Sequence, residues 1–512
     1  MDIPVPYAFI VVGALVLFFR LRKKPRFPPG PKGLPIVGNA LDLPKAREWL
    51  TYAKWSRECG SDIIHLRFFG THVFVLNSVK VVNELMVKRS AIYSDRGEWP
   101  MVKLTGWQRN FTFVDLGDHW KARARMFQQN LGTSTISRHR PKLVEGNRKL
   151  LLNLLLSPDD FMKHIRYLSG SSILGIIYGI EVQQDHDPFV ETAEKALQCL
   201  AAVINAGSYA VNYVPILRFL PTWAPGAQFK RDAAEWYKYV TALIDGPYTY
   251  VKKSLANGEN NTSIVGTLLQ ELSDDEKRSE QEDIIREAFG TAYTGGVDTT
   301  YSSVNSFILA MLKYPDVQRK AQEELDRVIG RDRLPSFDDR DALPYITAIV
   351  KETLRWGLVA PLAAPHQLRV DDEYEGYFLP AGSVIIGNAW VILNDEKRYP
   401  HPESFIPERY LTTDGTLDSS APDPTEACFG FGRRMCLGRY FAFDSLWIAV
   451  ASLAAAFHME KAVDESGSVI EPSGEYTSGT ACYPLPFKAV FRPRHEGVVA
   501  LIKADVSESD SL

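Results

Sequence analysis

This chain of 512 residues has few cysteines and a small net charge. The formal net charge is -4 and no nucleic-acid-binding motif occurs, so we expect no nucleic acid as a partner. No periodic repeat, low-complexity block or linker divides the chain, which excludes a repeat architecture and favours one main body. The few cysteines are odd in number and scattered, which favours a reduced compartment over a disulfide framework: Cys59, Cys199, Cys428, Cys436 and Cys482.

The first 24 residues combine an uncharged stretch with a basic cluster. Residues 3–19 carry no charge, and Lys and Arg then dominate from Arg20 to Arg26. This pattern predicts a single N-terminal transmembrane helix, with residues 1–24 as membrane anchor and basic flank in contact with membrane lipid. A cleaved signal peptide is the alternative, but its positive charge should precede the apolar stretch.

The rest of the chain divides into a short hinge, a long body and a tail. Residues 25–39 are rich in Pro and Gly and are predicted to form a stiff hinge. Residues 40–500 show mostly helical periodicity, with strand-like runs near 65–76, 375–386 and 488–491, so we expect one mainly α domain with small β-sheets. Residues 501–512 are predicted to form an acidic, disordered tail.

One cysteine lies in a glycine-rich loop before an apolar, helix-forming run. Residues 429–438 read Phe-Gly-Phe-Gly-Arg-Arg-Met-Cys-Leu-Gly. At a helix N-terminus, the dipole and backbone N–H groups favour the thiolate form of Cys436, which a metal requires. Gly432 and Gly438 would let the backbone approach a flat cofactor, while Arg434 would bind a carboxylate. The alternative is a buried structural cysteine; Cys428 lacks this Gly and Arg bracket.

These residues match the pattern FxxGxRxCxG, from Phe429 to Gly438, at every fixed position, and so the chain resembles the cytochrome P450 family. The resemblance covers essentially the full chain. It implies the cytochrome P450 fold and haem b (iron protoporphyrin IX) as cofactor, with Cys436 as the iron ligand. In its overall sequence the chain resembles microsomal-type fungal monooxygenases that modify terpenoids, indole derivatives or polyketides.

A second group of residues lies on a helix predicted over residues 282–313. Gly295 and Gly296 are adjacent in its interior, where each costs about 1 kcal/mol relative to alanine, and a helix bent over a cofactor would compensate. By the resemblance, Asp298 and Thr299 are the catalytic acid–alcohol pair that relays protons from water to dioxygen. The alternative is that both residues only bond to the local backbone.

A third group is the pair Glu352 and Arg355, on a helix predicted over residues 344–356. Such a pair three residues apart is usually a solvated contact worth a few tenths of a kcal/mol. Arg409 follows about fifty residues later, where the family has a second arginine, and the resemblance implies a buried structural network of the three.

The resemblance also implies residues that hold the haem carboxylates. They are His366, Arg434 and Trp120, the last opening a helix where the family pattern is WxxxR. Here the pattern breaks, because the residue four after Trp120 is Ala124. Arg123 is the better substitute, since residues three and four apart share a helix face.

The same resemblance also implies which residues line the substrate pocket, here called the substrate wall, but with less precision. We expect it to be mostly apolar or aromatic, although such residues are often ordinary core. The expected wall comprises Trp99, Trp107, Phe111, Phe113, Phe289, Tyr293 and residues 358–364 and 477–482. Residues 215–223 would dip into the membrane as a substrate entrance, or only pack between helices.

Together these features predict a haem-thiolate monooxygenase at the endoplasmic reticulum membrane, single-pass, with the catalytic domain facing the cytoplasm. It would insert one oxygen atom of dioxygen into a small hydrophobic or aromatic substrate, in secondary-metabolite biosynthesis. The chain has no dinucleotide-binding fingerprint, which implies NADPH-cytochrome P450 reductase as partner, docking near Arg433 and Arg439. The alternatives are a reductase-independent thiolate-haem isomerase or dehydratase, and a non-catalytic haem-binding membrane protein.

Overall fold

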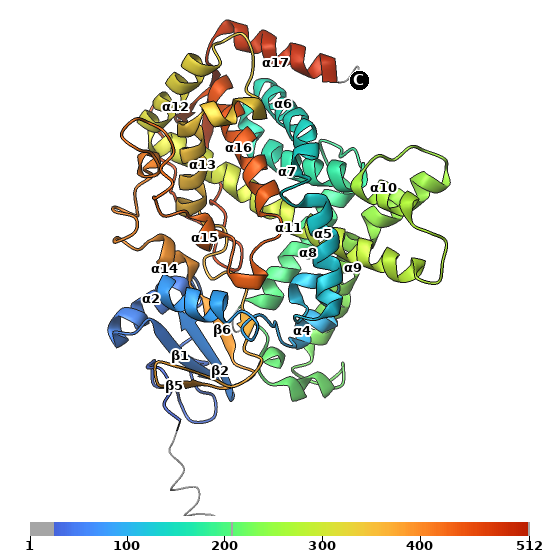
Figure 1. Cartoon of the computed structure of the whole chain (residues 1–512), viewed down its shortest axis with the longest axis vertical. Coiled ribbons are helices and arrows are strands. Elements are labelled where there is room, and N and C mark those ends of the chain that lie inside the picture. Colours follow the sequence, from blue (N-terminus) through green and yellow to red (C-terminus); the bar gives the residue numbers. More distant parts are fainter. Residues whose placement is uncertain (1–24, 206–207, 510–512) are drawn as a thin grey trace, which may run out of the picture.

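The computed structural model describes residues 25–205 and 208–509. Helices carry most of the chain (Figure 1). The helices are α2 (Glu48–Cys59), α3 (Val79–Val82), α4 (Pro100–Leu104), α5 (Asp118–Leu131), α6 (Arg140–Leu156), α7 (Phe161–Tyr178), α8 (Pro188–Ile204), α9 (Gln228–Ala256), α10 (Ile264–Glu271), α11 (Arg278–Lys313), α12 (Pro315–Val328), α13 (Pro344–Trp356), α14 (Ala389–Leu393), α15 (Thr425–Cys428), α16 (Arg439–Ala456) and α17 (Glu496–Ser509).

Three small sheets accompany the helices, so the predicted fold class, mainly α with small sheets, is confirmed. The largest has the order β1-β2-β6-β3, in which β2 and β6 are parallel and the other pairs are antiparallel. The strands are β1 (Ile63–Phe68), β2 (Thr71–Leu76), β3 (His366–Gln367), β4 (Asp372–Tyr374), β5 (Tyr377–Leu379), β6 (Val384–Gly387), β7 (Phe457–Lys461) and β8 (Ala489–Pro493).

Helix α11 forms the centre of the helical part. It is helical over its whole length, and every residue from Ser302 to Leu312 is buried. A helix segment that is buried on all sides must be surrounded by other elements. Helices α5, α7, α9 and α16 all pack against it, which brings α5 and the start of α16 close to its middle.

The segment predicted as a hinge packs against the largest sheet. The ring of Phe27 stacks on His65 at 4.8 Å, and the N–H of His65 donates to the carbonyl of Pro29 at 3.0 Å. A Cβ at Gly30 would lie 2.1 Å from the carbonyl oxygen of His65, so only glycine permits this approach. Residues 26–39 therefore belong to the folded body.

The predicted membrane anchor, residues 1–24, lies outside the described residues. Within residues 25–205 and 208–509, no helix is both long and apolar enough to cross a membrane. Figure 1 shows the strands β1, β2, β5 and β6 at the end of the molecule where residue 25 lies, and α17 at the opposite end.

The prediction of a disordered tail over residues 501–512 is wrong for the residues described, because residues 501–509 continue α17. Val498 and Ile502, four residues apart on one face of this helix, are buried, and the helix packs against α6. Arg148 on α6 also forms an ion pair with Asp505 at 2.9 Å. The apolar stripe that precedes the acidic residues is what holds the helix in place.

Candidate active site

A cavity of about 380 Å³ lies between the middle of α11, the loop before α16 and the segment that leads into β3. This volume is within the range of pockets that bind small organic molecules. Several residues predicted for the site line it: Trp120, Thr299, His366, Phe429, Arg434, Cys436 and Gly438. Residues far apart in the sequence therefore meet at one place.

The loop before α16 holds Cys436 in the cavity wall. The N–H of Cys436 donates to the carbonyl of Phe429 at 2.8 Å, and α16 begins three residues later at Arg439. The thiol is exposed to the cavity. Burial raises the pKa of the Cys436 thiol, while the N–H of Gly438 and the charge of Arg439 act in the opposite direction. A bound metal ion would deprotonate the thiol.

The two loop glycines have different roles. Gly438 lines the cavity, and a Cβ there would lie 3.9 Å from the sulfur of Cys436, so it fits the predicted place beside a flat cofactor. Gly432 does not line the cavity. Its φ is 59°, and a Cβ there would lie 2.0 Å from the carbonyl oxygen of Met86. The prediction for Gly432 is therefore corrected: glycine is needed there for backbone packing against residue 86.

A pair of buried arginines forms the basic end of the cavity. Arg434 donates to the carbonyls of Ser94 and Val114 at 2.7 and 2.5 Å, which leaves its Nη1 buried without a partner. Arg96 donates through Nε and Nη1 to carbonyls of residues 112, 364 and 365. Burial and the neighbouring Arg434 lower the pKa of Arg96 to about 9, and burial lowers the pKa of Arg434 to about 10.

Two buried like charges facing one cavity favour a ligand with negative charges. The two carboxylates of haem b fit this requirement, and the thiol of Cys436 fits the iron. Trp120 covers the guanidinium of Arg434, with 4.8 Å from Cζ to the ring centroid. His366 also lines this end, with Nδ1 2.6 Å from the carbonyl oxygen of Tyr93. Burial and the charge of Arg96 lower the pKa of His366 well below its usual value, so the arginines carry the positive charge.

Sequence reasoning missed Arg96. It lies in an irregular stretch between η1 (Asn83–Lys88) and α4, with no helical spacing or motif that marks it. Only the fold brings it to Arg434, which is more than 300 positions away in the sequence. No local signal could have identified it.

Arg123 is not placed to replace the missing arginine of the family pattern. Its Nε binds the carboxylate of Glu287 on α11 at 2.6 Å, and its Nη1 donates to the carbonyl of His119. It does not line the cavity, and Arg125 is exposed. The prediction for Arg123 is corrected on this ground: its guanidinium joins α5 to α11.

The acid–alcohol pair on α11 is divided between two environments. Thr299 lines the cavity, and its Oγ1 donates to the carbonyl of Gly295 at 2.7 Å. Asp298 does not line the cavity and instead forms an ion pair with Arg166 on α7, which also covers the ring of Tyr301 at 3.7 Å. In this structure the hydroxyl alone faces the reaction space.

The two adjacent glycines of α11 also differ. A Cβ at Gly295 would meet no atom within 4 Å, because this residue faces the cavity. A Cβ at Gly296 would lie 3.1 Å from the side chain of Ile173 on α7. Both glycines line the cavity; Gly295 leaves space there, and Gly296 also permits close packing of two helices.

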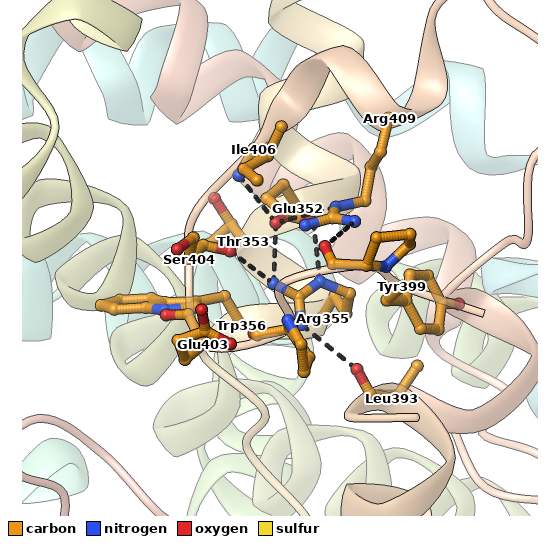
Figure 2. A network of polar contacts seen from close by, with 12 residues as sticks. Glu352, Thr353, Arg355, Trp356, Leu393, Tyr399, Glu403, Ser404, Ile406 and Arg409 are labelled. Atoms are coloured by element: carbon orange, nitrogen blue, oxygen red, sulfur yellow. Dashed lines mark hydrogen bonds and ion pairs between the residues drawn. The ribbon is translucent and has the colours of Figure 1, made fainter. Parts of the chain in front are cut away.

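Glu352, Arg355 and Arg409 meet in one buried network (Figure 2). Two parallel hydrogen bonds of 2.7 and 2.8 Å join Arg355 to Glu352, and the Nε of Arg409 is 3.2 Å from the same carboxylate. Glu352 also accepts from the N–H of Ile406 and the hydroxyl of Tyr410. Further bonds lead from Arg355 to the carbonyls of Leu393, Pro402 and Ser404. The network fixes the segment that runs from α14 to η9 (Pro407–Tyr410).

The expected substrate wall is present only in part. Phe111 lines the cavity together with residues 359, 360, 363 and 364. Trp107, Phe289 and Tyr293 are core residues instead, since each is fully buried and none lines the cavity. Trp99, Phe113 and residues 477–482 also lie outside the wall. The latter loop lies behind it, where the N–H of Cys482 donates to the carbonyl of Val359 at 2.7 Å.

Comparisons with known proteins agree with this geometry. The sequence model of the family described as Cytochrome P450 matches residues 28–480. The chain is 42% identical to cytochrome P450 monooxygenase 98 of Postia placenta, over 96% of both chains. It is 38% identical to cytochrome P450 monooxygenase ple1 of Rhodocybe pseudopiperita, over 94% of this chain and 92% of that one. It is also 38% identical to tryptamine 4-monooxygenase of Psilocybe cyanescens, over 96% and 98% respectively. The match over nearly the whole chain, together with a cavity that joins a loop cysteine to two buried arginines, shows that this chain belongs to the cytochrome P450 family and is a haem b monooxygenase.

Proposed function

We propose that this monooxygenase inserts one oxygen atom of dioxygen into a small hydrophobic or aromatic substrate in secondary-metabolite biosynthesis, with electrons from NADPH-cytochrome P450 reductase. The observation that carries the proposal is that Cys436, Thr299 and a mostly apolar wall face one cavity. Haem b, bound through the thiolate of Cys436, supplies the activation of dioxygen.

The protein residues would position the haem, neutralise its carboxylates and move protons near its iron. Arg96 and Arg434 would hold the two carboxylates, because both have guanidinium nitrogens left over after binding backbone carbonyls. Thr299 holds its hydroxyl proton toward the carbonyl of Gly295 and can exchange it with water in the cavity. Asp298 would resupply that proton only when its carboxylate leaves Arg166.

The reduced carbon-monoxide difference spectrum tests the ligand assignment. The purified chain should show a thiolate-type Soret band, and Cys436→His should lose it. Cys428→Ser is the matched control, since this second thiol also lines the cavity and its loss should leave the band unchanged. A band that survives Cys436→His would contradict the assignment.

Turnover tests the reaction class. With reductase, NADPH and labelled dioxygen, one labelled oxygen atom should enter the product. An isomerase or dehydratase would form product without NADPH, and a non-catalytic haem protein would form none. The relative from Psilocybe cyanescens, named for tryptamine, makes compounds with an indole ring a second class of substrate to test.

We also propose attachment to the endoplasmic reticulum membrane, with the catalytic domain facing the cytoplasm. The uncharged residues 3–19 and the basic cluster after them support this topology. Ile216, Phe219 and Trp223 are exposed by 72–81%, and Ile36 is exposed by 82%. The two segments lie near each other, because Tyr213 packs on Phe68 and belongs with Ala40 and Leu43 to the residues that cover one buried cluster. Deletion of residues 1–24 should release the protein from membranes, and a deletion variant that still sediments with them would leave the anchor without a role.

Reductase docking is proposed for the surface behind Cys436. Arg433 is exposed there, whereas Arg439 donates to the carbonyl of Cys436 at 3.0 Å and is partly engaged. Charge reversal at Arg433 should therefore slow electron transfer and weaken its dependence on salt. Unchanged rates would place the docking surface elsewhere.

A further inference from the structure

We infer that the cavity selects uncharged substrates and excludes organic cations. This class is narrower than that of the proposed function, on which the inference rests. It follows from the charge of the wall, from the partners of the acids around it and from its hydroxyl groups.

The charged side chains of the wall are cationic and lie at one end. Among the described residues that line the cavity, the permanently charged ones are Arg96 and Arg434, both directed to the place that fits the haem carboxylates. The other side of the cavity is formed by small and apolar residues: Phe111, Ile173, Ala292, Val359, Ala360 and Ala363. Because the haem carboxylates would take up the two arginine charges, a bound cation would meet an apolar surface with no counter-charge.

The acids near the wall in sequence are engaged outside it, including Asp95, next to Arg96, which is paired with Arg369 at 2.7 Å. Asp298, next to Thr299, is paired with Arg166, and Glu287, one turn before Thr291, is paired with Arg123 at 2.6 Å. The carboxylate of Asp115 accepts from the backbone N–H groups of residues 96 and 97, at 2.8 and 2.9 Å. None of these carboxylates lines the cavity.

The wall offers neutral polar contacts instead. Thr112 and Thr300 line the cavity, and among the described residues neither hydroxyl has a hydrogen-bond partner. By contrast, the hydroxyls of Thr291 and Ser303 donate to carbonyls of α11. The two unpaired hydroxyls can bind a hydroxyl, carbonyl or ring N–H of a substrate.

The physical consequence is a penalty specific to charge. A cation that enters this wall loses its hydration and gains no carboxylate partner, whereas a neutral molecule of the same shape loses little. The ring faces of Phe111 and Phe127 would attract a cation. The inference requires that the cost of removing water from the cation exceed this attraction.

The experiment compares two probes of equal shape and different charge. (2-Phenylethyl)trimethylammonium carries a permanent charge and cannot ligate iron, and (3,3-dimethylbutyl)benzene is its neutral isostere. The full-length haem protein is titrated with each, and the Kd is measured from the spin-state shift of the Soret band. We expect the neutral probe to bind at least about ten-fold more tightly.

A gain-of-charge variant tests the cause. Thr300→Asp places a carboxylate in the wall and should shift the ratio of the two Kd values toward the cation by at least about ten-fold. Thr300→Asn, of similar size and neutral, should leave the ratio near that of the wild type. Both variants are first checked for an intact thiolate-type spectrum, which also guards against misfolding.

Equal binding of the two probes to the wild type, or tighter binding of the cation, would overturn the inference whatever the variants do. Failure of both probes to bind would overturn it as well, because the wall then does not accept compact apolar molecules. Failure of the proposed function has another signature, namely a missing thiolate spectrum or the absence of labelled product with reductase.

Discussion

Glu352→Ala should destabilise the protein far more than loss of an exposed glutamate in the same type of ion pair. The side chains of Glu352 and Arg355 are both fully shielded from solvent. Without the carboxylate, Arg355 keeps its bonds to backbone carbonyls but becomes a buried charge without a counter-charge. Removal of one partner of such a pair costs about 3–5 kcal/mol in the free energy of unfolding.

The matched control is Glu323→Ala on α12. Glu323 binds Arg319 at the same distance, 2.7 Å, but the two side chains are 61% and 57% exposed. An exposed pair four residues apart on a helix contributes less than about 1 kcal/mol. The contrast therefore compares a buried carboxylate that binds several donors with an exposed carboxylate that binds one arginine.

The assay is urea unfolding followed by tryptophan fluorescence, with the Soret absorbance recorded in parallel. Glu352→Ala should lower the midpoint and release haem at lower urea than the wild type, whereas Glu323→Ala should shift neither appreciably. If the two variants differ by less than about 1 kcal/mol, the burial argument is refuted.

Three further predictions concern the cavity and the sheet. Arg96→Leu should lower the haem-to-protein ratio after gel filtration, whereas Arg123→Leu should keep that ratio; the reverse result would restore Arg123 as a carboxylate ligand. Thr299→Ala should keep the thiolate-type spectrum but release more hydrogen peroxide per NADPH, and unchanged coupling would remove Thr299 from proton delivery. Burial, with His72 and Arg67 nearby, lowers the pKa of His65 from 6.5 to about 4. The unfolded chain therefore binds the extra proton below pH 6.5, and stability falls by up to about 1.4 kcal/mol per pH unit down to pH 4. His65→Phe should flatten this slope in urea unfolding at stepped pH, and an unaltered slope would assign it to other groups.

The parts of the site that could be predicted from sequence are those encoded in contiguous residues. The loop of residues 429–438 carries its spacing within ten positions, and α13 begins and ends where its periodicity indicates. The strand-like runs also fall on β1, β2, β6 and β8 or beside them. In each case the local pattern and the tertiary environment agree.

The parts that could not be predicted depend on distant contacts. Gly432 has the same place in the motif whether it faces a cofactor or the carbonyl of Met86, and only the fold distinguishes the two. Asp298 belongs to the acid–alcohol pair by position, but its partner Arg166 comes from another helix. The tail was misjudged because its acidic end outweighed the short apolar stripe of Val498 and Ile502.

The break in the WxxxR pattern shows how a shift of one position changes the role of an arginine. Neighbouring positions on a helix differ by about 100° in direction, so an arginine at 123 cannot follow the direction of one at 124. Arg123 is directed to Glu287 on α11, while Ala124 is buried. One cation is thereby lost from the carboxylate end of the cavity and one ion pair is gained between α5 and α11. Arg96 and Arg434 would still provide one positive charge for each carboxylate of haem b, and removal of either arginine should therefore weaken haem binding more than in a site with three.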